Sequence, residues 1–92
     1  MPGGGKHMLK ITKRTENVGT TRVGLHGRFT GEYVREVEKA LSENAGRVVL
    51  NLENVTLVDR TAMEFLSTAR SRRIRIENMP SYVARWIQQE GS

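Results

Sequence analysis

Hydrophobic and polar residues alternate in two segments near the start of the chain, "MLKITKR" (8–14) and "TTRVGLHG" (20–27). Alternation with a period of two is typical of a strand that buries one face. Asn17 and Gly19 stand between the segments and favour a tight reversal of the chain. The pattern therefore predicts a hairpin whose second strand ends at Gly27.

Helical spacing follows in three later segments. After Thr30, whose hydroxyl suits an N-cap, apolar residues recur three and four positions apart, and Gly46 is a suitable stop. A second helix is predicted from Arg60 to about Ser71, and a third after Pro80, which suits a first helical turn. The apolar stripes are Tyr33, Val34, Val37, Ala40 and Leu41 in the first helix, Ala62, Met63, Leu66 and Ala69 in the second, and Tyr82, Val83, Trp86 and Ile87 in the third.

Two more strands are predicted between these helices. "RVVLNL" (47–52) is the most continuous apolar run and suits a central strand, followed by "ENVT" (53–56) as a loop. "RIRIEN" (73–78) alternates again, with Ile74 and Ile76 buried. The order is β-β-α-β-α-β-α, and alternating strands and helices favour parallel pairing with right-handed crossovers. Because one face of these strands is polar, we expect an α/β fold: a small mixed sheet with helices mainly on one face.

Length and composition narrow the class of protein. The 92 residues suit one domain, expected over 8–90, and the glycine-rich start (1–7) reads as a disordered leader or a cloning remnant. The chain has no cysteine, which excludes disulfides and thiolate metal sites and fits a reducing cytoplasm. No apolar run reaches the roughly 20 residues that a membrane span needs. The formal charge of +5 is a weak indication of an anionic partner.

Three consecutive polar residues interrupt the apolar segment "NVTLVDRTAMEFL" (54–66): Asp59, Arg60 and Thr61. Asp59 suits the N-cap of the second helix, because its carboxylate can accept from free backbone amides. Arg60 and Thr61 then fall on the exposed first turn. The triplet is expected to close the strand, cap the helix and face solvent.

Catalytic and metal-binding patterns are not found. Histidines and carboxylates do not occur at metal-ligand spacing, and there is no G-x-S-x-G motif. "PGGGKH" follows no strand and has the wrong spacing for a phosphate loop. A triad of Thr61, His26 and Asp59 is disfavoured, because nothing in the sequence fixes its geometry. We expect a protein that is not an enzyme and needs no cofactor or metal.

Three segments together resemble the STAS domain, the fold of bacterial anti-sigma-factor antagonists and of sulfate-transporter tails. They are "VGLHGRFTGEYVREVEKAL", "GRVVLNLENVTLVDRTAMEFL" and "RIRIENMPSYVARWI". In that family a strand of the form "vvLdLsgV" precedes "t-ϕ-ϕ-D", where ϕ is apolar, and then a helix. The matching residues here are Val48–Val55 and Thr56–Asp59, and the resemblance covers residues 8 to about 89.

The resemblance implies a bacterial signalling module that binds another protein, either a kinase-like anti-sigma factor or a larger regulatory or transport complex. Both Asp59–Glu64 and Arg28–Glu32 follow the carboxyl ends of parallel strands, where α/β folds place their sites, so they are expected to lie together. The predicted contact residues are Arg28, Thr30, Asp59, Arg60, Thr61 and Glu64.

The resemblance also implies a phosphorylated Ser or Thr directly after the Asp, and this chain departs from that pattern. Arg60 occupies the position and cannot accept a phosphoryl group. Thr61 matches the family's second hydroxyl position, while Ala62 replaces a common Gly and Thr30 replaces a frequent Asp. Either Thr61 is the acceptor, or the module binds its partner without this switch.

Two alternatives from other classes are kept open. In the first, the N-terminus of the second helix binds a nucleotide or another small anion, with Arg60 supplying charge. In the second, a basic open sheet face that includes Arg22, Arg73 and Arg75 binds nucleic acid. The second is disfavoured, because the alternation places no aromatic residue on that face for base stacking.

Overall fold

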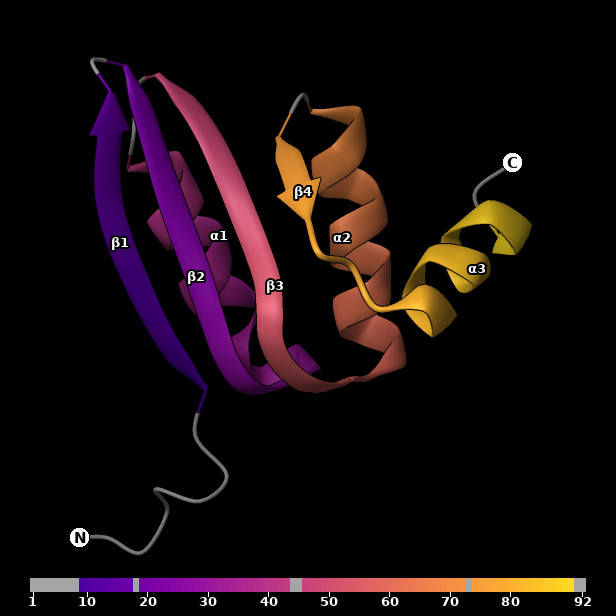
Figure 1. The fold of residues 1–92 in the computed structure, drawn as a ribbon. Coiled ribbons are helices and arrows are strands. Elements are labelled where there is room, and N and C mark those ends of the chain that lie inside the picture. The colour runs from indigo at the N-terminus through magenta and orange to yellow at the C-terminus, as the bar shows by residue number, and fades with distance from the viewer. Residues whose placement is uncertain (1–8, 18, 44–45, 73, 91–92) are drawn as a thin grey trace, which may run out of the picture.

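The computed structural model describes residues 9–17, 19–43, 46–72 and 74–90, so the expected leader (1–7), the first residue of the predicted first strand (8) and Arg73 lie outside the described residues. Figure 1 shows the order β-β-α-β-α-β-α that the sequence predicts. The elements are β1 (Lys10–Asn17), β2 (Thr20–Phe29), the short 3₁₀ helix η2 (Gly31–Tyr33), α1 (Val34–Ser42), β3 (Arg47–Val58), α2 (Arg60–Ser71), β4 (Arg75–Glu77) and α3 (Ser81–Glu90).

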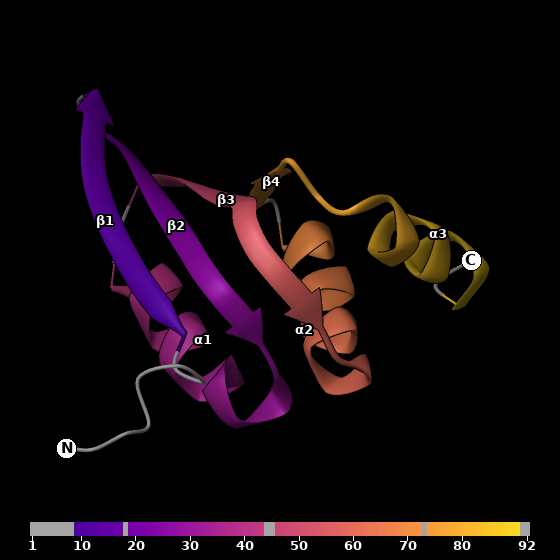
Figure 2. The same cartoon turned by 60° about the horizontal axis from the view of Figure 1, so that its bottom comes forward.

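The four strands form one mixed sheet in the order β1-β2-β3-β4. β1 is antiparallel to β2, as expected for a hairpin, and β3 is parallel to both β2 and β4. Figure 2 shows α1 and α2 against one face of the sheet, while α3 lies beyond β4, next to α2. The prediction of a small mixed sheet with helices mainly on one face is confirmed. No helix of the described residues is long and apolar enough to cross a membrane.

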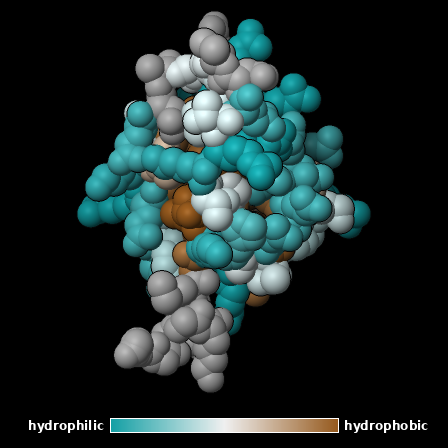
Figure 3. Space-filling model, turned by 60° about the vertical axis from the view of Figure 1, so that its left-hand side comes forward, coloured by the Kyte–Doolittle hydropathy of each residue, from teal (hydrophilic) through white to brown (hydrophobic). Residues whose placement is uncertain are grey.

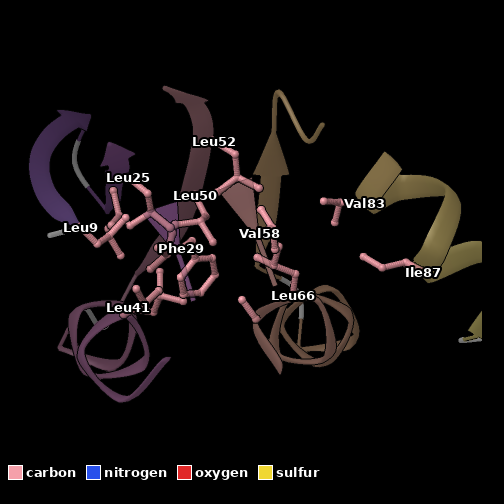
Figure 4. Packing of buried hydrophobic residues seen from close by; sticks show 14 residues of the cluster. Leu9, Leu25, Phe29, Leu41, Leu50, Leu52, Val58, Leu66, Val83 and Ile87 are labelled. Atoms are coloured by element: carbon pink, nitrogen blue, oxygen red, sulfur yellow. The ribbon is translucent and has the colours of Figure 1, made fainter. Parts of the chain in front are cut away.

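The core lies between the sheet and the helices. Figure 4 shows leucines of the sheet pointing toward Leu41 of α1 and Leu66 of α2, with Phe29 between them. Phe29 also packs edge-on against Phe65, with ring centroids 6.0 Å apart. Val83 and Ile87 of α3 complete the cluster. Each side chain of this size stabilises the fold by about 1.5–3 kcal/mol when it is fully buried.

The outer strand β1 is protected from pairing with another chain by its charges. Lys10, Lys13, Arg14 and Glu16 are all exposed. Figure 3 shows the β1 side of the molecule, where hydrophilic residues cover most of the surface around a small hydrophobic area. Charged side chains on an edge strand discourage edge-to-edge association.

The strands are longer than the sequence pattern suggests. β2 does not end at Gly27 but continues to Phe29, because Gly27 adopts a positive φ of 109° and the strand then buries Phe29 completely. The "ENVT" segment (53–56) is not a loop but part of β3. The β2–β3 register shifts twice along this stretch, and the Asn51 side chain accepts from the Glu53 amide at 3.0 Å beside the first shift. Bulges of this kind insert an extra residue into one strand while the pairing continues beyond it.

Several smaller predictions are also wrong. Thr30 precedes η2 and makes no side-chain capping bond, and α1 begins only at Val34. α1 ends at Ser42, before Gly46, and its last turn is closed by the Glu43 amide. Ile74 and Ile76 are half-buried, because the short strand β4 stands at the edge of the sheet.

Candidate functional site

One carboxylate joins the two loops at the carboxyl ends of β2 and β3. Asp59 Oδ1 accepts from the Ala62 amide at 2.9 Å, and its Oδ2 accepts from the Gly31 amide, also at 2.9 Å. The Asp59 amide donates to the Phe29 carbonyl at 3.3 Å. The predicted N-cap is therefore present, and the same side chain fixes the position of the 3₁₀ turn that follows β2.

This arrangement decides against an anion site at the start of α2. The half-buried Asp59 places a negative charge at the positive end of the helix, which is favourable for α2 itself. Its two oxygens already accept from the amides that a bound phosphate would need. A nucleotide at this position would displace or repel the carboxylate.

The two loops approach each other closely at Gly31. A Cβ atom added to Gly31 would lie 3.0 Å from both Cβ and Cγ2 of Thr61. Thr61 is exposed, so its hydroxyl is accessible at the first turn of α2. In the 3₁₀ turn that follows, burial and then the charge of Glu32 raise the pKa of Tyr33.

The charged residues of the predicted site project into solvent. The side chains of Arg60 and Glu64 are 77% and 60% exposed, with the Arg60 Nε atom 3.9 Å from the Glu64 Oε2 atom. Exposed pairs at this distance hold each other weakly and remain available to a partner. Arg28 is exposed and Thr30 half-buried at the end of β2. The six predicted residues thus lie at the end of β2 and the start of α2, the two segments that Asp59 joins.

Two further residues beside this site were missed by the sequence analysis. Leu57 and Tyr82 are 37% and 48% exposed, the large hydrophobic residues that the described chain leaves in solvent. The Tyr82 hydroxyl accepts from the Val58 amide at 2.9 Å, which holds the start of α3 beside the end of β3. Tyr82 was predicted to lie in the core stripe of α3, and that prediction is wrong. The only signal in the sequence was the hydroxyl group of Tyr82, which needs a hydrogen-bond partner or solvent.

A groove between α2 and α3 continues the same surface. It has a volume of about 270 Å³ and is lined by Arg60, Glu64, Ser67, Trp86 and Glu90. Trp86 is half-buried in it. We refer to the whole area as the carboxyl-end surface, which consists of Arg28, Leu57, Thr30, Asp59, Arg60, Thr61, Glu64, Tyr82 and Trp86.

The residues of the disfavoured catalytic triad lie apart in the structure. His26 lies opposite Lys10 and Asn54 in the sheet register and contacts the Thr12 hydroxyl at 3.4 Å, so it does not join Asp59 and Thr61 in a triad. Among the described residues there is no group of three or more histidines and carboxylates that could hold a metal ion.

The basic open face is also partly neutralised. Arg22 on β2 binds Glu16 of β1 and Glu77 of β4, and Arg75 lies 3.5 Å from Glu77. Arg73, the third arginine of the nucleic-acid alternative, lies outside the described residues. With Arg22 engaged on both sides, the described part of this face offers less free positive charge than the sequence suggests.

Comparisons with known proteins identify the fold. No protein-family model matches the chain, and a search of curated proteins finds no match. The chain is similar to the crystal structure of an antisigma-factor antagonist, STAS domain, from Rhodobacter sphaeroides, with a TM-score of 0.58 and 19% identity over 74% of this chain and 84% of that one. It is also similar to part of a structure described as "Crystal Structure Analysis of Mglu", with a TM-score of 0.61 and 21% identity over 75% of this chain and 19% of that one. This chain thus spans about a fifth of the latter protein, and the fold is STAS-like.

Proposed function

We propose that this STAS-like chain is a non-enzymatic regulatory module of the anti-sigma-factor antagonist type, which binds another protein through the carboxyl-end surface. The observation that carries the proposal is the Asp59 carboxylate, which accepts from the Gly31 and Ala62 amides and so makes two loops into one surface. The partner is a kinase-like anti-sigma factor or a subunit of a larger regulatory or transport complex in the bacterial cytoplasm.

The chemistry of the surface supports recognition of a protein. Arg, Tyr and Trp are the residue types that contribute most often to the energetic centre of interfaces. Arg60, Tyr82 and Trp86 supply one of each, and Leu57 adds apolar area beside them. Charged residues at the margin, such as Glu64, then favour the correct partner over others.

Regulation by phosphorylation has one remaining candidate. Arg60 stands where the family usually has its phosphorylatable residue, so Thr61 is the hydroxyl left at the helix start. A phosphate there would add about −1.5 to −2 charges beside the Asp59 carboxylate. We propose that the module binds its partner in the unphosphorylated form, and that phosphorylation of Thr61 weakens this binding because the phosphate repels the Asp59 carboxylate in the carboxyl-end surface.

The proposal is tested by capture and binding with a charge-swapped variant. Arg60→Glu combined with Glu64→Lys reverses two exposed charges without changing the net charge. The control is Arg70→Glu with Glu53→Lys, which also leaves the net charge unchanged and reverses two exposed charges outside the carboxyl-end surface. We expect wild type and control to recover the same protein from host cytoplasm and to bind it after purification, whereas the site variant loses it. Equal binding by all three folded proteins would contradict the proposal.

The fluorescence of Trp86 provides an independent measurement of partner binding. Trp86 is the single tryptophan of the chain and lines the groove between α2 and α3. Binding of a purified tryptophan-free partner fragment at the carboxyl-end surface should shift or quench its fluorescence. An unchanged emission spectrum at saturation would place the partner elsewhere on the molecule.

A further inference from the structure

A second groove lies at the opposite end of the sheet, where β3 begins. Its volume is about 860 Å³, and its lining includes four arginines that are far apart in the sequence: Arg22, Arg47, Arg72 and Arg75. They come from β2, the start of β3, the end of α2 and β4. We call this the arginine groove. It shares no residue with the carboxyl-end surface.

Arg22 is the fixed part of the groove. Its Nε donates to Glu16 at 2.8 Å and its terminal nitrogen donates to Glu77 at 2.5 Å. This contact lowers the pKa of the Glu77 carboxyl. Both acidic residues that line the groove bind Arg22, and Glu77 also lies 3.5 Å from Arg75, so two carboxylates stand against four guanidinium groups.

The other three arginines are held less firmly than Arg22. Arg47 makes no ion pair with any described residue, and the Arg75 side chain is 76% exposed with its Nε 3.5 Å from Glu77. Arg72 contacts Glu38 of α1 at 3.4 Å and stands at the C-terminus of α2, where a cation is favoured. The helix C-terminus therefore explains why an arginine stands at position 72. It does not explain Arg47 and Arg75, which lie on the neighbouring strands β3 and β4.

The floor of the groove is apolar. Val49 is paired with Arg75 in the register of β3 and β4, and it shares a face of β3 with Arg47, because side chains two positions apart point the same way. Val49 is only 8% exposed, and Ile74, which also lines the groove, is half-buried. The groove thus combines an aliphatic floor with guanidinium groups around it.

We propose that the arginine groove binds an organic polyphosphate of nucleotide size, with phosphates on Arg47 and Arg75 and the organic body against Val49 and Ile74. One guanidinium group can donate two parallel hydrogen bonds to the oxygens of a phosphate. The volume lies within the roughly 300–1,000 Å³ of small-molecule sites. No aromatic side chain occurs among the described residues that line the groove, which favours a small anion over single-stranded nucleic acid.

The test uses metal-free ATP as the probe on the full chain. Amide chemical shifts in ¹⁵N-labelled protein should change at 46–49 and 74–77, and not at the start of α2. Arg47→Gln with Arg75→Gln should weaken ATP binding about tenfold or more, since two charge-assisted contacts are lost. The matched control, Arg28→Gln with Arg60→Gln, removes the same charge at the carboxyl-end surface and should bind ATP as wild type does.

Three outcomes would overturn the proposal. Equal weakening in both variants would show that ATP responds only to net charge. The absence of saturable binding at millimolar ATP would remove the site. An oligonucleotide that binds more tightly than ATP, and is lost in the Arg47 and Arg75 variant, would assign the groove to nucleic acid. Each measurement uses variants whose melting temperature matches that of wild type. This match is expected because all four substituted arginines are exposed.

Discussion

The two ends of the sheet are held together by different means. At the carboxyl end, a short carboxylate accepts from two backbone amides, at Gly31 and Ala62. At the amino end, the backbones of Gly19 and Gly46 touch, and the Arg47 amide donates to the Gly19 carbonyl at 2.7 Å. Around that contact, the ion pairs are made by long side chains at the surface.

This difference indicates what each end can recognise. A short side chain bonded to backbone amides has few rotamers, so the loops at the carboxyl end present a fixed geometry that suits a protein partner. Exposed ion pairs contribute only about 0–1 kcal/mol each and exchange partners easily. The exposed arginines at the amino end, Arg47 and Arg75, can therefore turn toward an incoming anion at small cost. Three predictions, each with its own comparison variant, test this contrast.

The largest effect is expected at the glycine contact of the amino end. A Cβ atom added to Gly46 would lie 2.2 Å from the Gly19 carbonyl oxygen, which is backbone and cannot rotate away. Gly46→Ala should therefore separate β3 from the β2 hairpin end and lower the free energy of unfolding by about 1–3 kcal/mol, as overpacking does. Urea denaturation at neutral pH measures it.

Gly31→Ala is the matched control at the carboxyl end. There the added Cβ lies 3.0 Å from the Cβ and Cγ2 atoms of Thr61, a much milder overlap than the 2.2 Å contact at Gly46. We expect a smaller loss of stability than for Gly46→Ala. The opposite order would mean that the carboxyl end, and not the amino end, is the tightly closed one.

The second prediction concerns Asp59 itself. Asp59→Ala removes the cap of α2 and should cost about 0.5–2 kcal/mol of stability. It should also speed hydrogen exchange of the Gly31 amide, because that donor loses its acceptor. Asp59→Asn keeps one acceptor oxygen and should retain the cap to Ala62 while freeing Gly31. Unchanged exchange at Gly31 in both variants would show that the loops hold together without this side chain.

The sequence predicted the parts of the fold that depend on regular spacing. The α2 bounds, the Asp59 cap and the mixed sheet follow from hydrophobic period, capping chemistry and the order of the elements. These are properties of neighbouring residues, so a single sequence contains them. The role of the carboxyl-end surface in binding a partner stays a prediction.

Other features depend on tertiary contacts that the local pattern does not contain. Gly27 and the "ENVT" segment (53–56) resemble strand ends, but β2 and β3 continue through them because each is paired with a neighbouring strand. Tyr82 has core spacing, yet its hydroxyl binds the Val58 amide and the ring stays exposed. The arginine groove could not be found either, because Arg22 and Arg75 meet only through the sheet topology.

The smallest effect is expected from the ion pairs of the amino end, and it depends on pH. Arg22 lowers the pKa of Glu77 below its usual value near 4.5. A carboxyl whose pKa is lower in the folded state stabilises the fold above that usual value, and the contribution is lost as the pH falls through the folded pKa. Wild type should therefore melt at a higher temperature than Glu77→Gln at pH 7, and the difference should shrink below about pH 4.5 and vanish in stronger acid. Glu53→Gln, at an exposed residue without an ion pair among the described residues, should show no such pH-dependent difference. If the Glu77→Gln difference were constant with pH, the contact would act through packing or hydrogen bonding alone, and the amino end would be less dependent on charge than the comparison of the two ends requires.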